Sequence, residues 1–310
     1  MKYPSIAGVC VAVFLIGIAV FFYTLDHSVP TANTYQRTVA LWQERFRTQG
    51  ITRAYAQFVR EGNTLPPNQS HTLAHIVGAI LFDSKGLSGL AYCTADFNYG
   101  CYHGFAGRVI EQNGIGGIQM LLDTCAGQSV IGDCEHGIGH GILAYLGDDK
   151  LTEALRLCPL PGGAGTGGCY NGVFMEYFLD TLRSDQGGQP LRFEPSQPEG
   201  PCKTMPAQFQ PACYYELPSW WRVLRVYQGA DYTGQFTSVG EHCEEVTDAA
   251  LREICFSGAG AQIAPATRFD LARAKELCSL MPEDGRTACL NEAMNSISSF
   301  SSVHTANTAP

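Results

Sequence analysis

The chain has 310 residues, enough for one large domain or two ordinary ones, and 45% of them are hydrophobic, which is enough for a packed core. Only 16% are charged, and the formal net charge is −9. Such an acidic balance gives no basic surface for a phosphate backbone, so we expect no nucleic acid partner.

The N-terminus carries an apolar stretch of membrane-spanning length. Residues 5–23 hold no charge, Lys2 precedes them and Asp26 follows. We predict a transmembrane signal-anchor at 5–23, with residues 1–4 in the cytoplasm. The chain would then be a single-pass membrane protein whose C-terminal domain lies in the periplasm or the extracellular space. A cleaved signal peptide is the alternative, although its apolar region is usually shorter.

Cysteine usage fits such a compartment. Of 13 cysteines, Cys10 lies inside the apolar stretch, and the other twelve form an even set. No Cys-x-x-Cys occurs, which excludes zinc ribbons, thioredoxin-like redox pairs and covalent haem attachment. In an exported chain, twelve cysteines are most simply a disulfide framework.

Composition divides the rest of the chain into three parts. Residues 24–64 read as a polar stalk followed by one or two opening helices, in which apolar side chains recur at helical spacing. Residues 65–295 carry a repeated cysteine motif and form the predicted repeat domain. Residues 296–310 are rich in Ser, Thr and Ala, and we expect them to be disordered.

A short motif recurs along the repeat domain. Cys101-Tyr-His103-Gly104 is followed by the related segments at Cys134 and Cys169 and by weaker ones further on. The aligned positions are occupied by His71, His103, His136, Asn171, Tyr215, Ser257 and Asn291. The steps between them are 32, 33, 35, 44, 42 and 34 residues. Four of these steps are close to the 34-residue period of a helix–turn–helix repeat.

Each unit also follows one order of elements. A first helix ends near one cysteine, a short Gly/Pro/Asp turn follows, and a second cysteine opens the second helix. The separations within the six pairs are 8, 9, 11, 11, 12 and 11 residues. The pairs are Cys93 with Cys101, Cys125 with Cys134, Cys158 with Cys169, Cys202 with Cys213, Cys243 with Cys255, and Cys278 with Cys289. This regularity predicts six bridges, each within one hairpin and each contributing about 3 kcal/mol in the chain-entropy estimate. Free, buried cysteines are the alternative.

In its period and its order of elements the chain resembles tetratricopeptide-like helical repeats stapled by disulfides, over roughly residues 65–295. The family's Trp-Leu-Gly-Tyr and Ala-Phe-Pro positions are not recognisable here. The resemblance implies an all-α fold of helix–turn–helix repeats, solenoid-like and stapled within each repeat. An aromatic cluster around Tyr214, Trp220 and Trp221 is expected in the core, with a ligand-facing wall as the alternative.

Histidines are concentrated at equivalent positions of the first units. Five of the eight fall in this register: His71, His75, His103, His136 and His140. Two histidines four residues apart share one face of a helix, and neighbouring repeats lie side by side. Neutral imidazole suits zinc, copper or iron, so these five residues are the predicted metal ligands. Glu176, one residue past the equivalent of His75 and His140, is a further candidate ligand or general base.

Other interpretations of the cluster stay open. In one interpretation, the histidines form a structural, hydrogen-bonded core. In another, two of the histidines hold a haem. Close glycines such as Gly104 and Gly139 either serve helix packing or help to build the site. No Gly-x-Ser-x-Gly or phosphate loop supports other chemistry.

Two classes of function follow from these features. The first is a membrane-anchored, extracytoplasmic metal-binding repeat protein, and the sequence leaves open whether it is a metalloenzyme. The second is a disulfide-stapled scaffold that holds a partner protein on its repeat surface, or assembles in a membrane complex, without a metal.

Overall fold

The computed structural model describes residues 32–126, 131–158, 166–179, 197–227 and 229–307. These residues form thirteen α-helices, α2 to α14, and contain no β-strand. The fold is therefore all-α, as predicted. The predicted anchor, residues 5–23, lies outside the described residues, and within the described part no helix has both the length and the apolar character that spanning a membrane requires.

Two helices open the described chain. α2 (Ala32–Gln49) and α3 (Ile51–Gly62) form a hairpin around Gly50, whose φ of 77° lies in the left-handed region that glycine tolerates. Trp42 of α2 meets Phe58 of α3 edge to face, with ring centroids 6.0 Å apart. Both rings are among the largest fully buried side chains of the described residues, and their contact joins α2 to α3.

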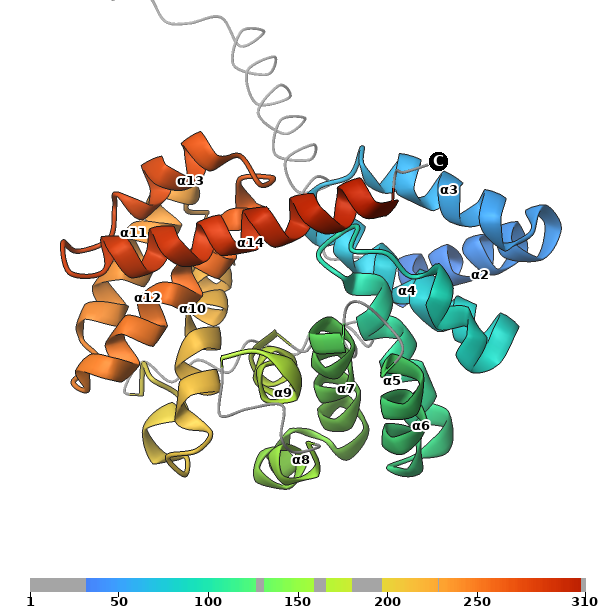
Figure 1. The fold of residues 1–310 in the computed structure, drawn as a ribbon, viewed down its shortest axis with the longest axis horizontal. Helices are drawn as coiled ribbons and strands as arrows, with labels where there is room; N and C mark the ends of the chain where they lie inside the picture. The colour runs from blue at the N-terminus through green and yellow to red at the C-terminus, as the bar shows by residue number, and fades with distance from the viewer. Residues whose placement is uncertain (1–31, 127–130, 159–165, 180–196, 228, 308–310) are drawn as a thin grey trace, which may run out of the picture.

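The helices that carry the aligned motif form an inner row. They pack against each other in chain order along an arc (Figure 1). These inner helices are α4 (Pro67–Lys85), α5 (Gly100–Asn113), α7 (Ile131–Leu146), α9 (Gly168–Leu179), α10 (Gln210–Tyr227), α12 (Ala249–Ala266) and α14 (Arg286–Asn307). Equivalent positions of successive units therefore become neighbours in space.

The outer elements are less uniform than the sequence predicted. They are η1 (Gly86–Tyr92), α6 (Gly116–Cys125), α8 (Leu151–Leu157), η4 (Cys202–Thr204), α11 (Tyr232–Glu244) and α13 (Leu271–Cys278), with the short η2 (Asp148–Lys150) before α8. Two units thus open with a 3₁₀ turn where a full helix was expected. Gly86 and Gly89 weaken helix formation in η1, and Pro201 and Pro206 confine η4.

All six predicted disulfides are present in the structure, so the alternative of free, buried cysteines is wrong for these twelve residues. Each bridge joins the outer element of a unit, or the residue directly after it, to the first turns of the inner helix that follows. Their Cα–Cα distances lie between 5.4 and 6.1 Å, within the usual range for a bridge. The bridges join Cys93 to Cys101, Cys125 to Cys134, Cys158 to Cys169, Cys202 to Cys213, Cys243 to Cys255, and Cys278 to Cys289.

A thiol count tests this pairing in solution. We expect the full chain, unfolded in denaturant without reductant, to react with thiol reagent at Cys10 only. After reduction all 13 cysteines should react. Reduction should also destabilise the fold strongly, by about 3 kcal/mol for each short loop that is opened. Three or more reactive thiols before reduction would contradict the six-bridge framework.

Glycines bring the inner helices into backbone contact. A β-carbon on Gly104 of α5 would overlap the carbonyl oxygen of His75 on α4, and one on Gly172 of α9 would overlap that of His136 on α7. Gly139 stands in the same relation to Cys169. The close approach predicted for these helices is therefore real, and it places the backbones that carry the histidines in direct contact.

Two further predictions concern the aromatic cluster and the C-terminal residues. Tyr214, Trp220 and Trp221 are at most 3% exposed, so this aromatic cluster belongs to the core. Residues 296–307, expected to be disordered, continue α14 as helix to Asn307. Phe300 stacks on Phe269 with ring centroids 3.8 Å apart, a contact that ties this part of the helix to the fold.

Candidate metal centre

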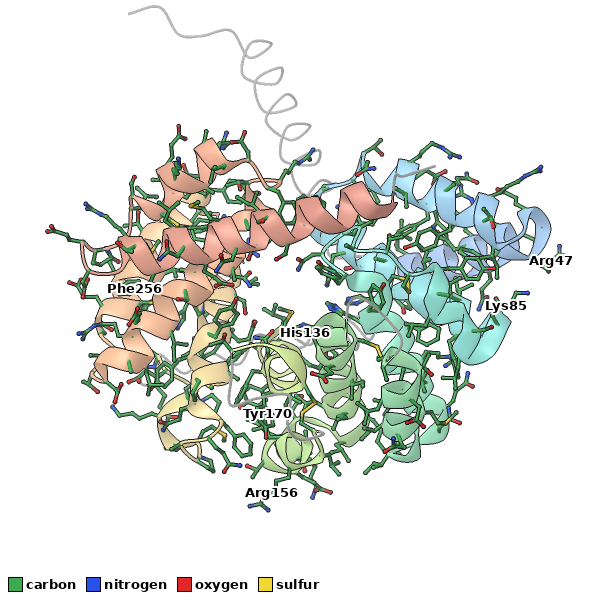
Figure 2. The ribbon with its side chains drawn as sticks, viewed as in Figure 1. Arg47, Lys85, His136, Arg156, Tyr170 and Phe256 are labelled. Atoms are coloured by element: carbon green, nitrogen blue, oxygen red, sulfur yellow. A yellow bond between two sulfur atoms is a disulfide. The ribbon has the colours of Figure 1, made fainter. Side chains whose placement is uncertain are left out.

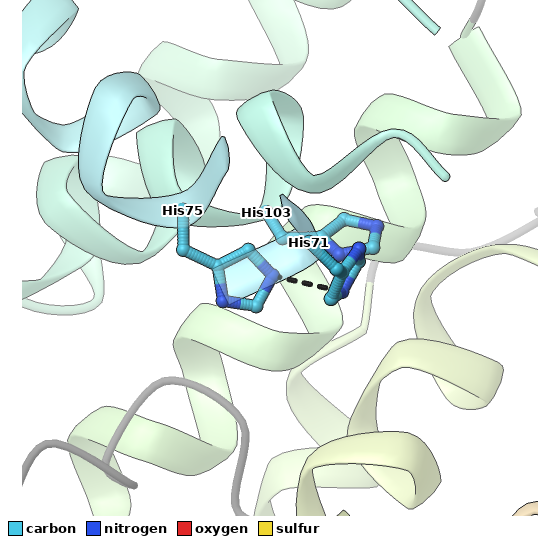
Figure 3. Close-up of side chains that lie close together, drawn as sticks. All are labelled: His71, His75 and His103. Atoms are coloured by element: carbon cyan, nitrogen blue, oxygen red, sulfur yellow. Dashed lines mark hydrogen bonds between the residues drawn. The ribbon is translucent and has the colours of Figure 1, made fainter. Parts of the chain in front are cut away.

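One histidine pair lies on α4. His71 and His75 are one turn apart, and their Nε2 atoms approach to 3.0 Å (Figure 3). The Nδ1–H of His71 donates to the carbonyl oxygen of Phe97 at 2.7 Å. Because a carbonyl only accepts, this bond fixes the tautomer of His71 and leaves the Nε2 lone pair facing His75.

The Phe97 carbonyl is supplied by an unusual segment. Phe97, Asn98 and Tyr99 all have φ between 55° and 59°, in the left-handed region that side chains other than Asn and Gly disfavour. They lie in the loop closed by the disulfide between Cys93 and Cys101, directly before α5. The bridge and the adjoining helix hold this conformation and aim the carbonyl at His71. No sequence signal marked Phe97 as part of the site.

The second pair lies on α7 and repeats this arrangement. The Nε2 atoms of His136 and His140 are also 3.0 Å apart. The Nδ1–H of His140 donates to Oε2 of Glu176 on α9 at 2.9 Å, and both side chains are completely buried. Figure 2 shows His136 at the side of α7 that faces the inside of the arc.

His103 on α5 lies between the two pairs. Its ring centroid is 5.3 and 5.5 Å from those of His71 and His75, and 4.8 and 4.7 Å from those of His136 and His140. The five rings thus lie in one cluster, as the repeat register predicted. His103 is 2% and His140 is 0% exposed, whereas His71 and His136 are partly exposed.

The distances fit metal ligation. Two nitrogens bound to one ion at about 2.0–2.1 Å lie about 2.9–3.4 Å apart for bond angles of about 90–109°. Each Nε2 pair meets this condition at 3.0 Å. The donor atoms form two triplets, one of His71, His75 and His103 and the other of His103, His136 and His140, each with all atoms within 4.8 Å of one another.

No family model, no curated protein and no solved structure matches this chain.

Burial keeps the imidazoles neutral. Desolvation lowers the pKa of His71, and it holds the pKa values of His103 and His136 well below the ordinary value, with neighbouring histidines lowering the latter two further. For His140, desolvation and then His71 lower the pKa to about 3. A neutral imidazole is the form that binds metal, so the cluster is ready for an ion at neutral pH without first losing protons.

Glu176 occupies a different place from the one expected of a ligand. Its carboxylate meets Nδ1 of His140, whereas Nε2 of His140 faces His136. A carboxylate in this position orients a ligating imidazole and raises its basicity. Glu176 therefore hydrogen-bonds to the candidate ligand His140 on the side of the ring away from His136, and neither triplet includes Glu176.

The structure adds two residues that the sequence did not single out as functional. Asn171 on α9 makes a side-chain hydrogen bond with His136 and donates from Nδ2 to Oε1 of Glu216 on α10 at 2.5 Å. Burial raises the pKa of Glu216 to about 7, against the opposing effect of its hydrogen bonds to Asn171 and Ser219. The sequence could have pointed to Asn171, because this residue occupies the aligned position of the repeat. For Glu216 the only such feature is that it follows Tyr215, which also occupies the aligned position.

Proposed function

We propose that this chain is a metal-binding protein of an oxidising, extracytoplasmic compartment, and that its five clustered histidines hold a first-row transition metal. The convergence of two Nε2 pairs at 3.0 Å on either side of His103 carries the proposal. Six disulfides among the described residues are typical of chains that fold outside the reducing cytoplasm.

The donor set favours particular ions. All candidate donors are neutral imidazoles, which suit zinc, copper and iron more than magnesium or calcium. Haem is disfavoured, because each pair of Nε2 atoms comes from one helix and points to the same place instead of lying on opposite faces of a macrocycle. We further propose that residues 5–23 anchor the chain in a membrane.

Supporting groups complete the proposed site. Phe97 and Glu176 fix His71 and His140, respectively, with Nδ1 protonated and Nε2 directed at the ion. Asn171 and Glu216 extend the hydrogen-bonded network behind His136. Three protein ligands in each triplet leave a coordination position for water or another small ligand, as in catalytic rather than structural sites.

Elemental analysis tests the proposal. The purified full chain, stripped with chelator and then dialysed against zinc, copper(II) or iron(II), should retain metal in stoichiometric amount. Replacing both His136 and His140 with Ala should remove at least one equivalent, because one pair of donors is lost. His242→Ala, on α11 outside both triplets, is the matched control and should retain the wild-type amount.

The scaffold alternative makes the opposite prediction. A chain that folds with all its disulfides, stays free of metal under every loading condition and purifies with a specific protein partner would remove the metal proposal. Thiol counts and far-UV circular dichroism on each variant separate loss of metal from loss of fold.

A further inference from the structure

The ligand atoms of the cluster fall into two groups, and this division bears on how many ions it holds. Two nitrogens bound to one ion at about 2.1 Å cannot lie further apart than about 4.2 Å, even when they are opposite each other. The structure collects the donors into two separate triplets that share only His103. Two ions with one common ligand satisfy this arrangement without moving either helical pair.

The second ring nitrogen distinguishes His71 and His140 from His103. An imidazole that binds one metal ordinarily donates its other N–H to a carboxylate, a carbonyl or water. His71 does so to Phe97 and His140 to Glu176. Nδ1 of His103 is buried and has no hydrogen-bond partner among the described residues. A buried polar atom without a partner destabilises the fold, so this nitrogen requires an explanation.

The position of His103 between the two histidine pairs explains this nitrogen. It stands on α5, the helix between those that carry the two pairs, and its ring lies within 5.5 Å, centroid to centroid, of all four other rings. Gly104, the next residue, allows α5 to contact the backbone of α4 at His75. His103 therefore lies between one pair of rings on the α4 side and one pair on the α7 side.

We propose that His103 bridges two transition-metal ions as an imidazolate, one ion held by His71 and His75 and the other by His136 and His140. This inference rests on the proposed metal-binding function and adds its nuclearity. Both ring nitrogens of His103 become metal ligands, so binding of the second ion releases the remaining ring proton of His103 to solvent. Ions bound on either side of one ring, with bonds of about 2.1 Å, lie about 6 Å apart.

Copper(II) is the probe, because two copper ions joined by an imidazolate couple magnetically. The full chain loaded with copper(II) should bind two ions. Its integrated electron paramagnetic resonance signal should fall below the copper content found by elemental analysis. The variant lacking His71 and His75 and the variant lacking His136 and His140 should each bind one ion and give the full signal for that ion. His242→Ala should match the wild type.

Replacing His103 tests the bridge itself. His103→Ala should restore the signal to the full copper content and weaken copper binding at least tenfold. If this variant fails to fold, as judged by circular dichroism and thiol count, the two pair variants decide the matter alone. Binding of a single ion by the wild-type chain, or of two ions with full signal, would overturn the bridge and leave the proposed function intact. Binding of no ion would overturn both.

Discussion

Acidification from pH 7 to pH 5 is expected to destabilise the metal-free protein by about 4 kcal/mol. The buried histidines cause a loss of stability over this range, and one buried carboxyl group partly offsets that loss. The pKa values of His103 and His136 are held well below 6.5 in the fold, and burial lowers that of His140 to about 3. Well above pH 6.5 both the folded and the unfolded chain keep these rings neutral, so they contribute no pH dependence there.

Below pH 6.5 only the unfolded chain takes up the protons, and stability is lost as the pH falls toward the folded pKa. For a ring that stays neutral in the fold, the loss between pH 7 and pH 5 is about 2 kcal/mol, or about 6 kcal/mol for three. Glu216 acts in the other direction. Its raised pKa of about 7 makes the folded chain bind a proton that the unfolded chain still lacks. This contributes about 2 kcal/mol of stability over the same range.

Urea unfolding of the chelator-treated full chain at pH 7, 6 and 5 measures this balance. Glu216→Gln should remove the opposing contribution and steepen the loss to about 6 kcal/mol. A stability that is constant or rises between pH 7 and pH 5 would contradict the neutral state of the cluster.

Replacing Gly172 with Ala should cost about 3 kcal/mol or more of unfolding free energy and should also weaken metal binding. The new β-carbon would overlap the carbonyl oxygen of His136, which is backbone and cannot rotate away. Relief requires α9 to move from α7. That movement would separate Glu176 on α9 from His140 on α7 and so disturb the ring that it orients.

Gly132→Ala is the matched control on α7. Among the described residues, no atom outside its own helix lies within 4 Å of a β-carbon at Gly132, so this change should be neutral or stabilise the helix by up to about 1 kcal/mol. Urea midpoints at pH 7 for the two variants, with metal content measured alongside, give the comparison. Equal midpoints would show that the inner helices do not need backbone contact at Gly172.

Local spacing was sufficient to predict the disulfides and the histidine register. Cys278 and Cys289 are 11 residues apart on the two sides of one short turn, so the hairpin alone brings them together. Once hairpins stack, residues at equal positions become neighbours, and His103 had to lie between the pairs on either side. The expected role of Glu176 as a ligand needed more than spacing, because its carboxylate approaches His140 from the side away from His136.

By itself the sequence determined the all-α class, the six cysteine pairs and the gathering of five histidines, because each depends on periodicity or on short loops. Only the tertiary structure decided which ring nitrogens face each other and which are hydrogen-bonded to groups outside the cluster. The carbonyl of Phe97, the carboxylate of Glu176 and the amide of Asn171 reach the histidines from other helices or from a loop in left-handed conformation. Their positions depend on interhelical distances and on local backbone angles, neither of which a repeat period specifies.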